Sequence, residues 1–342
     1  TLISSGGGVF ERAAKAIDLS PEIRATLGLE ATRLTPAEVV SAILAAEVDL
    51  LWFGGIGTYV RGDAESDAAV GDRANDGVRV GASQVRAQVI GEGANLGVTQ
   101  QGRVDFARAG GGINTDAIDN SAGVDCSDHE VNIKILLGAA VAAGDLTAIQ
   151  RDRLLADMTD EVADLVLRDN YDQTQALTLM ADAAAARLDD HQALIRALER
   201  GPLKLDRRLE GLPDEEEMAA RCAAGAGLTR PELAVLLAYA KMDLFDRLKA
   251  SDLPDDEALT DDLVAYFPDR LNVQFGDLIP RHRLGREIIA TSVTNSLMNR
   301  LGADAVRNLS ASSGAGDDEV ARAFLVARAV FDLPGLWQAV ET

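Results

Sequence analysis

Short, continuous apolar runs alternate with more polar stretches in the amino-terminal part of the chain. These runs predict three strands, over Asp49–Phe53, Ala87–Ile90 and Ile113–Ile118. An unbroken apolar run bounded by turn residues favours a strand that is buried in a parallel sheet. Helical patterns lie between the strands. Strands and helices that alternate in this way indicate a parallel sheet with right-handed crossovers.

Three helices are predicted in the same part of the chain. Ser20-Pro21-Glu22 begins a short helix with proline at its first position. The segment Thr35-Pro36-Ala37-Glu38 is a capping box, also with proline at the first helical position, and it predicts a helix over Pro36–Ala46. The segment Val98–Arg108 predicts a third helix, although Gly102 weakens that pattern. The polar stretch Asp63–Asp76 indicates a solvated loop.

The strand signals end near Ser127, and apolar residues then recur with the period of a helix. The segments with this period are Val131–Ala143, Leu146–Asp169, Gln173–Arg200, Glu215–Ala224, Thr229–Ala250, Asp261–Tyr266, Gly285–Leu301 and Asp317–Phe331. Such stripes are far more often the packed core of a helical domain than a ligand groove. The second part of the chain is therefore predicted to be helical.

Small residues and asparagines follow two of the predicted strands. Glu92-Gly93-Ala94-Asn95 comes after the second strand, and Asp119-Asn120-Ser121-Ala122-Gly123 comes after the third. Glycine lets a ligand approach the backbone, and an asparagine amide both donates and accepts hydrogen bonds. Ligands of open α/β sheets bind at the carboxyl ends of the strands. We therefore predict that the two asparagine-bearing turns lie side by side at one rim of the sheet and form the ligand site.

The turn after the first strand is Gly54-Gly55-Ile56-Gly57. It lacks the last glycine of the dinucleotide fingerprint G-x-G-x-x-G and the helix that follows it, so the pattern alone is weak evidence for cofactor binding. A glycine-rich phosphate-binding loop of the kind that opens a dinucleotide-binding domain is not found in the sequence. The chain also begins TLISSGGGVF, without an initiator methionine. We interpret it as a fragment of a longer polypeptide.

Two interpretations are open for Ser127. If one helix begins near Asn120, then Gly123 and Ser127 share its face with Asn120 and look back across the strand ends. Alternatively, Ser127-Asp128-His129-Glu130 is a capping sequence, and Ser127 simply begins a helix there. The pattern alone favours the capping interpretation.

Composition and charge exclude some classes of partner. The 342 residues carry a formal net charge of −22, with 47% hydrophobic residues. This charge argues against nucleic acid or an anionic membrane as a partner, and no apolar run is long enough to span a bilayer. Two cysteines, Cys126 and Cys222, form no disulfide framework and fit a cytoplasmic location.

The segment Cys126-x-x-His129 resembles half of a metal site, but a structural zinc ion needs four ligands, usually with more than one cysteine. We therefore expect no metal. His191 and His282 lie in helical patterns and are interpreted as solvated or structural residues.

Several long motifs resemble the large, multidomain bacterial NAD-specific glutamate dehydrogenases. They are LLWFGGIGTYV, IGEGANLGVTQQGR and GGGINTDAIDNSAGVDCSDHEVNIKILL, and they occur in the family's order. The resemblance covers roughly Ser4–Gly138, and the helical remainder resembles the C-terminal region of the same class.

The resemblance implies a fold, a reaction and a set of site residues. The fold is α/β plus all-α: a partial Rossmann-like, NAD-binding catalytic domain over residues 1–143, and a helical C-terminal domain over 144–342. The reaction is the oxidative deamination of L-glutamate to 2-oxoglutarate and ammonia, with hydride transfer to NAD. The residues implied to bind the cofactor are Gly54, Gly55, Ile56, Gly93, Ala94, Asn95 and Asn120. Ser127 is implied to bind the side-chain carboxylate of the substrate, which favours the interpretation of Ser127 as a residue that faces the site.

The resemblance also has gaps. The catalytic lysine and aspartate and the first glycine-rich loop lie upstream in the family, and Lys15 and Lys134 do not occupy matching positions. We therefore expect no catalytic residue in this fragment and no activity from the fragment alone. The smaller family members carry N-A-G-G where this chain has Asn120-Ser121-Ala122-Gly123. A homo-oligomer is expected for the full-length enzyme.

Two alternatives remain. The helical part on its own would serve as a non-catalytic scaffold or oligomerisation module. Another amino-acid dehydrogenase of the same superfamily would act on leucine or phenylalanine. Ser127 disfavours that second alternative, because an apolar substrate pocket does not favour a hydroxyl group.

Overall fold

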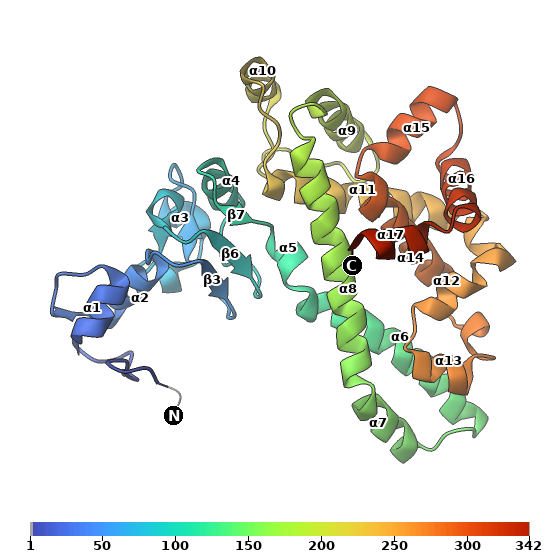
Figure 1. The fold of residues 1–342 in the computed structure, drawn as a ribbon, viewed down its shortest axis with the longest axis horizontal. Coiled ribbons are helices and arrows are strands. Elements are labelled where there is room, and N and C mark those ends of the chain that lie inside the picture. The colour runs from blue at the N-terminus through green and yellow to red at the C-terminus, as the bar shows by residue number, and fades with distance from the viewer. Residues whose placement is uncertain (1–2, 342) are drawn as a thin grey trace. The chain divides into compact units, whose positions relative to one another are not determined.

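Short strands and capped helices build the amino-terminal part of the chain, and helices build most of the rest (Figure 1). The structure is a computed structural model in which residues 3–341 are described, so the outermost residues of both predicted domains lie outside the described residues. The chain divides into two compact units. The first runs to Asn120 and includes Glu210–Leu212 and Thr229–Glu232, and the second contains the remainder.

The first unit contains a three-stranded parallel sheet in the order β3-β6-β7. Its strands are β3 (Leu50–Phe53), β6 (Val89–Glu92) and β7 (Gly112–Ile113). Phe53 lies opposite Glu92, and Ile90 lies opposite Ile113. The predicted parallel sheet is confirmed, although β6 is shifted by two residues toward the carboxyl end of the predicted segment.

The two faces of this sheet differ. Phe53, Ile90 and Ile113 are buried in the core of the first unit, together with residues from the flanking elements. On the opposite face Leu50 and Trp52 are 54% and 57% exposed. The prediction that the first strand is buried throughout is therefore wrong, because its side chains alternate between a packed face and an open one.

The third predicted strand is largely wrong. Only Gly112–Ile113 pairs as a strand, and Asp116–Asp119 forms the short helix α5. The reason lies in the two aspartates at the ends of α5. Their carboxylates accept hydrogen bonds from the backbone at the end of β6, at Glu92, and just beyond it, at Leu96, which a continued strand would not allow.

Local capping explains the helices of the first unit. Thr35 and Glu38 form the predicted capping box at the start of α2 (Pro36–Leu44), and Thr99 caps α4 (Gln100–Arg108). The segment predicted as a loop over Asp63–Asp76 instead contains two helical turns, because Ser66 caps the first of them. The remaining elements are β1 (Ile17–Asp18), α1 (Pro21–Leu27), β2 (Arg33–Leu34), β4 (Val60–Arg61), α3 (Asp67–Val70), η1 (Arg73–Asn75), β5 (Val80–Gly81) and η2 (Ala82–Gln84).

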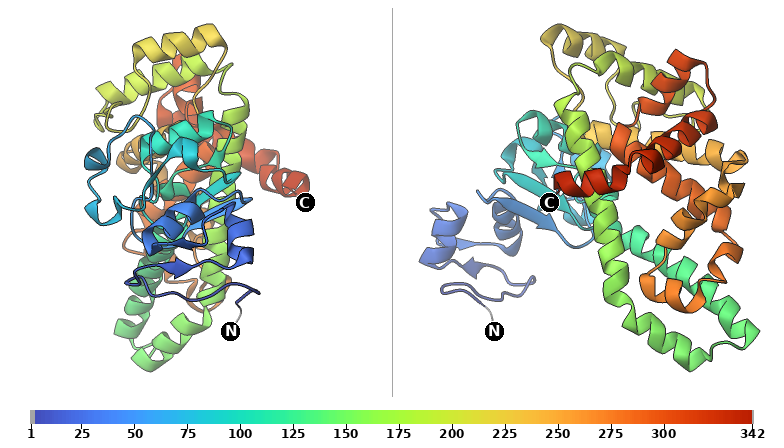
Figure 2. Two further views of the ribbon diagram at one scale, coloured as in Figure 1. Left: turned by 90° about the vertical axis from the view of Figure 1, so that its left-hand side faces the viewer. Right: turned by 45° about the vertical axis from the view of Figure 1, so that its right-hand side comes forward.

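The second unit is helical, as predicted. Helix α6 packs against α8, and α14 packs against both α8 and α12 (Figure 2). Leu137, Leu177 and Leu297, one from each of α6, α8 and α14, are fully buried. The helices are α6 (Ser121–Ala143), α7 (Ala148–Asp157), α8 (Thr159–Asp182), α9 (Leu188–Arg200), α10 (Glu215–Ala224), α11 (Arg230–Ala250), α12 (Thr260–Ala265), α13 (Asp269–Phe275), α14 (Gly285–Leu301), α15 (Ala305–Ser313), α16 (Asp317–Val330) and α17 (Leu333–Glu341), with 3₁₀ turns η3 (Leu253–Asp255), η4 (Glu257–Leu259) and η5 (Ile279–Arg281).

The sequence pattern missed some helix boundaries. The segment predicted as one helix over Leu146–Asp169 is divided at Met158 between α7 and α8. Helices α13, α15 and α17 were not predicted, since each has at most nine residues and offers too few turns for a clear period. Over residues 3–341 no single helix has the length and apolar composition of a membrane span. Helices α16 and α17 meet those criteria only together, across a 70° bend.

Candidate functional site

The candidate site lies in the first unit, where β3 and β6 end. These strands are parallel neighbours, so Gly54-Gly55-Ile56 and Gly93-Ala94-Asn95 leave the sheet at the same rim. Ile56 and Asn95 are exposed, whereas Ala94 is buried beneath them. The rim therefore presents backbone and small side chains toward the open edge.

The two predicted asparagines meet at this rim. The Nδ2 atom of Asn120 donates a hydrogen bond of 2.7 Å to Oδ1 of Asn95. The prediction that the two asparagine-bearing turns lie side by side is confirmed. Among the described residues, the side-chain oxygen of Asn120 (Oδ1) and the side-chain nitrogen of Asn95 (Nδ2) have no hydrogen bond. One acceptor and one donor of this pair are therefore available to a ligand.

Two aspartates from α5 hold the rim in place. Asp119 accepts hydrogen bonds from the Glu92 backbone at 3.0 Å and from the Asn114 side chain at 2.7 Å. Asp116 accepts one from the Leu96 backbone at 2.8 Å. Burial raises the pKa of Asp119, and its hydrogen bonds with Asn114 and Glu92 oppose that rise.

Leu96 shows that the rim backbone is constrained. Its φ angle is +55°, in the left-handed region that side-chain-bearing residues seldom adopt. The Asp116 carboxylate holds the amide of this residue, and the side chain of Leu96 is 59% exposed. Such strain concentrates at functional sites when the surrounding structure enforces it.

A buried ion pair lies beneath the rim. Arg103 from α4 donates two hydrogen bonds to Glu92, at 2.6 and 3.0 Å, and the Val98 backbone donates a third at 2.9 Å. Burial raises the pKa of Glu92 against the effect of Arg103, while the same carboxylate raises the pKa of Arg103. We regard both groups as charged, because three donors converge on one fully buried carboxylate.

Trp52 forms the open face beside the rim. A Cβ atom added at Gly91 or at Gly93 would collide with its indole ring, so the exposed ring lies directly against the β6 backbone. Gly55 is different, because a Cβ added there meets no atom within 4 Å.

Sequence reasoning missed several of these residues. Trp52 was taken as part of a buried run. Arg103 carried no signal, because nothing in its spacing from Glu92 indicates contact. Asp116 and Asp119 are detectable in principle as an acidic pair three residues apart, but the predicted third strand contains Asp116 and ends just before Asp119.

Ser127 lies in the second unit, on α6. That helix begins at Ser121, so the interpretation of Ser127 as a helix cap is wrong. Its side chain is exposed, and within residues 3–341 its Oγ atom donates only to the Gly123 carbonyl of its own helix, at 3.4 Å. Lys134 pairs with Glu130 on the same exposed side of α6.

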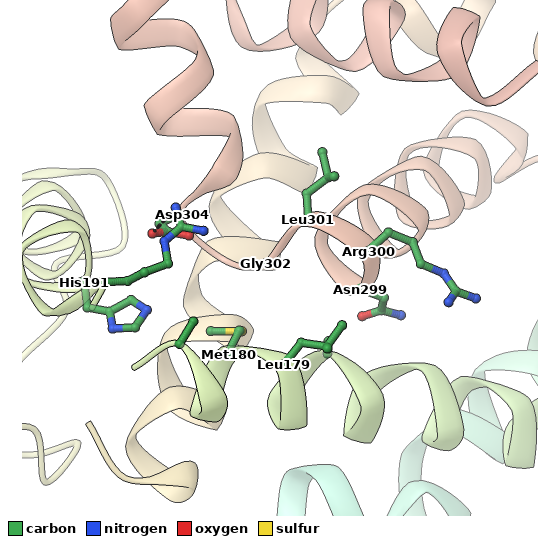
Figure 3. A pocket seen from close by; sticks show the side chains of 11 residues that line it. Leu179, Met180, His191, Asn299, Arg300, Leu301, Gly302 and Asp304 are labelled. Carbon is green, nitrogen blue, oxygen red and sulfur yellow. Dashed lines mark ion pairs between the residues drawn. The ribbon is translucent and has the colours of Figure 1, made fainter. Parts of the chain in front are cut away.

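A separate small cavity of about 120 Å³ lies within the second unit (Figure 3). His191 is 1% exposed beside it, and Arg187 pairs with the buried Asp304 at 2.9 Å. Burial lowers the pKa of His191, against the raising effect of Asp304. His191 is therefore structural rather than solvated.

Fold and site together define a class of protein: an α/β segment with a polar rim at the ends of parallel strands, followed by a helical unit. The sequence matches the family model described as "Bacterial NAD-glutamate dehydrogenase, catalytic domain" over residues 1–180, and the model described as "Glutamate dehydrogenase, C-terminal" over residues 225–342. Because the first match covers more than half of its residues, the chain belongs to the bacterial NAD-glutamate dehydrogenase family.

Three similar proteins carry the name NAD-specific glutamate dehydrogenase. The protein from Pseudomonas aeruginosa is 52% identical over 341 residues, which are 99% of this chain and 21% of that protein. Those from Halomonas elongata and Mycobacterium tuberculosis are each 48% identical, over 99% and 100% of this chain and 21% of each relative. The chain thus spans about a fifth of the length of these relatives.

Proposed function

We propose that this chain is part of an NAD-dependent glutamate dehydrogenase that converts L-glutamate and NAD to 2-oxoglutarate, ammonia and NADH. The observation that carries the proposal is the hydrogen bond between Asn95, in the turn after β6, and Asn120, at the end of α5, in a chain that matches the family's catalytic model. In this proposal the chain positions the nicotinamide and one end of the substrate. Positioning alone contributes several kcal/mol to lowering a reaction barrier.

The rim fits a nicotinamide. The carboxamide group of nicotinamide offers an oxygen that accepts and a nitrogen that donates hydrogen bonds. The oxygen complements the side-chain nitrogen of Asn95, and the nitrogen complements the side-chain oxygen of Asn120. Space beside Gly55 leaves room for a ligand to approach the backbone. We assign the cofactor to Gly54, Gly55, Ile56, Gly93, Ala94, Asn95 and Asn120. The bound cofactor would supply the hydride acceptor.

We further propose that the sheet is part of a Rossmann-like domain. Parallel sheets are normally covered on both faces, and the exposed Leu50 and Trp52 leave one face for a further layer. In functional terms the cofactor domain spans residues 1–143, including α6, and the helical C-terminal domain spans 144–342. The full enzyme is proposed to be a cytoplasmic homo-oligomer that binds neither nucleic acid nor membranes.

We assign the side-chain carboxylate of glutamate to Ser127. Its hydroxyl is exposed and is engaged only by a long hydrogen bond within α6, so it is free to donate to an anion. We propose that the proton-transfer residues lie in the part of the longer polypeptide outside these 342 residues. The isolated chain should then form no NADH from glutamate and NAD.

The test is Ser127→Ala in the complete enzyme. We expect the kcat/KM for glutamate to fall by the equivalent of about 1.5–3 kcal/mol, the worth of a hydrogen bond to a charged group, with little change in the KM for NAD. Ser312→Ala is the matched control, because Ser312 is also an exposed helical serine that donates to its own helix. An unchanged kcat/KM for glutamate in Ser127→Ala would refute the assignment.

A further inference from the structure

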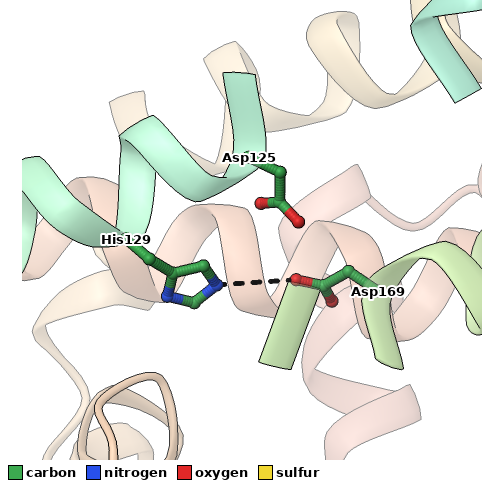
Figure 4. Close-up of side chains that lie close together, drawn as sticks. All are labelled: Asp125, His129 and Asp169. Carbon is green, nitrogen blue, oxygen red and sulfur yellow. Dashed lines mark ion pairs between the residues drawn. The ribbon is translucent and has the colours of Figure 1, made fainter. Parts of the chain in front are cut away.

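A second cluster of polar side chains lies in the helical unit. Asp125 and His129 are four residues apart on α6 and therefore share one side of that helix. Asp169 points toward them from α8 (Figure 4). One potential ligand atom from each residue lies within 4.8 Å of the others, and His129 Nε2 is 3.7 Å from Asp169 Oδ2.

The cluster is poorly satisfied by hydrogen bonds. His129 is only 4% exposed, and its Nε2 atom faces Asp169 at 3.7 Å, which is too far for a hydrogen bond; within residues 3–341 that nitrogen has no hydrogen-bond partner. The buried Oδ2 atom of Asp125 also has no partner. Buried polar atoms are almost always paired, because an unpaired one costs free energy. Three side chains that converge without bonding one another indicate a missing ligand.

We propose that Asp125, His129 and Asp169 bind a divalent first-row transition-metal ion such as Mn²⁺ or Zn²⁺. One imidazole nitrogen and two carboxylate oxygens form a mixed donor set that such ions accept. Metal bonds of about 2.0–2.2 Å at tetrahedral angles place ligand atoms roughly 3.3–3.6 Å apart. The His129–Asp169 distance of 3.7 Å is already close to that range, and rotation of the Asp125 carboxylate brings in the third ligand.

The surroundings leave room for an ion and its water ligands. All three residues border a cavity of about 280 Å³. Its wall also includes other polar side chains and three arginines that already pair with acidic residues: Arg168 and Arg300 with Asp172 and Glu341, and Arg328 with Asp262. An ion therefore has a path of entry, and water completes its coordination. Tyr266 stacks on the His129 ring at 4.5 Å between centroids and holds the imidazole in place.

Two carboxylates, Asp125 and Asp169, converge in the cluster, and a cation between them would relieve their repulsion. Lys241 on α11 acts electrostatically on both Asp125 and Asp169, and its Nζ atom donates to Gln173 at 3.2 Å. Among the described residues no carboxylate oxygen lies within ion-pair distance of that nitrogen, so Lys241 does not neutralise the pair by contact.

This proposal differs from the Cys126-x-x-His129 pattern considered in the sequence. Cys126 follows Asp125 directly and is not among the three converging residues. A site built from one histidine and two aspartates joins α6 to α8 across a gap of forty residues in the chain, from His129 to Asp169. No sequence spacing would reveal it.

The test is a titration of the 342-residue chain with Mn²⁺ after dialysis against EDTA. Binding is measured as the loss of the electron paramagnetic resonance signal of free Mn²⁺. We expect one Mn²⁺ per chain. His129→Gln and Asp169→Asn should each weaken binding by about tenfold or more, since even indirect partners of a metal contribute 10–100-fold. Asp164→Asn is the control, because Asp164 is an exposed aspartate on α8, the helix that carries Asp169. The Asp164→Asn variant should bind Mn²⁺ with the affinity of the wild type. Cys126→Ser should also bind Mn²⁺ normally.

Two results would overturn the proposal: no saturable Mn²⁺ binding by the wild-type chain, or equal binding by the wild type and Asp169→Asn. If His129→Gln lowers the melting temperature in EDTA, Asp169→Asn decides the question, because the Asp169 side chain is 39% exposed and tolerates substitution. A parallel titration with Zn²⁺ that fails only in Cys126→Ser would place that ion on the thiol and count against the site.

Discussion

The strand rim and the α6–α8 cluster both gather carboxylates, but they satisfy them differently. At the rim, Asp116, Asp119 and Glu92 each accept hydrogen bonds from neighbouring backbone or side-chain donors. In the cluster, Asp125 and His129 retain buried atoms without partners. The rim is therefore complete as a scaffold and offers only its outer amides to a ligand, whereas the cluster is incomplete without one.

The largest expected effect comes from removing a support of the rim. Glu92→Ala leaves Arg103 buried with only Asp116 and Gln100 as partners. We expect a loss of about 3 kcal/mol in the free energy of unfolding, at the low end of the cost of breaking a buried pair because Asp116 remains. Urea denaturation measures the loss.

Glu130→Ala is the matched control for this substitution, since Glu130 and Lys134 form an exposed pair. Its cost should be about 0–1 kcal/mol. Equal losses in the two variants would show that the rim does not depend on its buried ion pair.

A smaller effect is expected for the open face of the sheet. Gly93→Ala places a methyl group against the Trp52 indole. We expect a loss of about 1 kcal/mol, the low end of the cost of overpacking, because the exposed ring can swing away. Gly55→Ala, which meets no neighbouring atom, should change stability by less than about 0.5 kcal/mol. Denaturation curves that do not separate these variants would contradict the contact.

Much of the rim was predictable, and most of its supports were not. Apolar runs followed by glycine and asparagine located the ends of β3 and β6, because strand burial and turn chemistry are local properties. The prediction of the third strand failed because Asp116 and Asp119 accept hydrogen bonds from residues that lie 20 and 27 positions earlier in the chain. The meeting of His129 with Asp169 depends on helix packing, which has no local signature.

A pH dependence of stability is expected in the helical unit. Burial lowers the pKa of His191. The carboxylates of Asp304 and Asp190 act to raise this pKa, whereas the charge of Arg187 lowers it further. A histidine in the unfolded chain has a pKa of about 6.5. As the pH falls, the unfolded chain therefore binds a proton at His191 before the folded chain does. The contribution of neutral His191 is thus complete above about pH 6.5 and is lost as the pH falls toward its folded pKa.

Urea unfolding at about pH 7.5 and pH 5.5 measures this dependence. The loss of stability on acidification should be smaller in His191→Gln than in the wild type, by at most about 1.4 kcal/mol per pH unit for one group. An identical loss in both proteins would show that His191 is not the group responsible.

The most direct test of the central claim, that the paired asparagines hold the nicotinamide, is NADH binding to the complete enzyme. We predict that Asn95→Ala and Asn120→Ala each weaken binding roughly fivefold, as expected for the loss of one hydrogen bond. Asn308→Ala in α15 should bind as the wild type does. Folded Asn95→Ala and Asn120→Ala enzymes that bind NADH with unchanged affinity would contradict the claim.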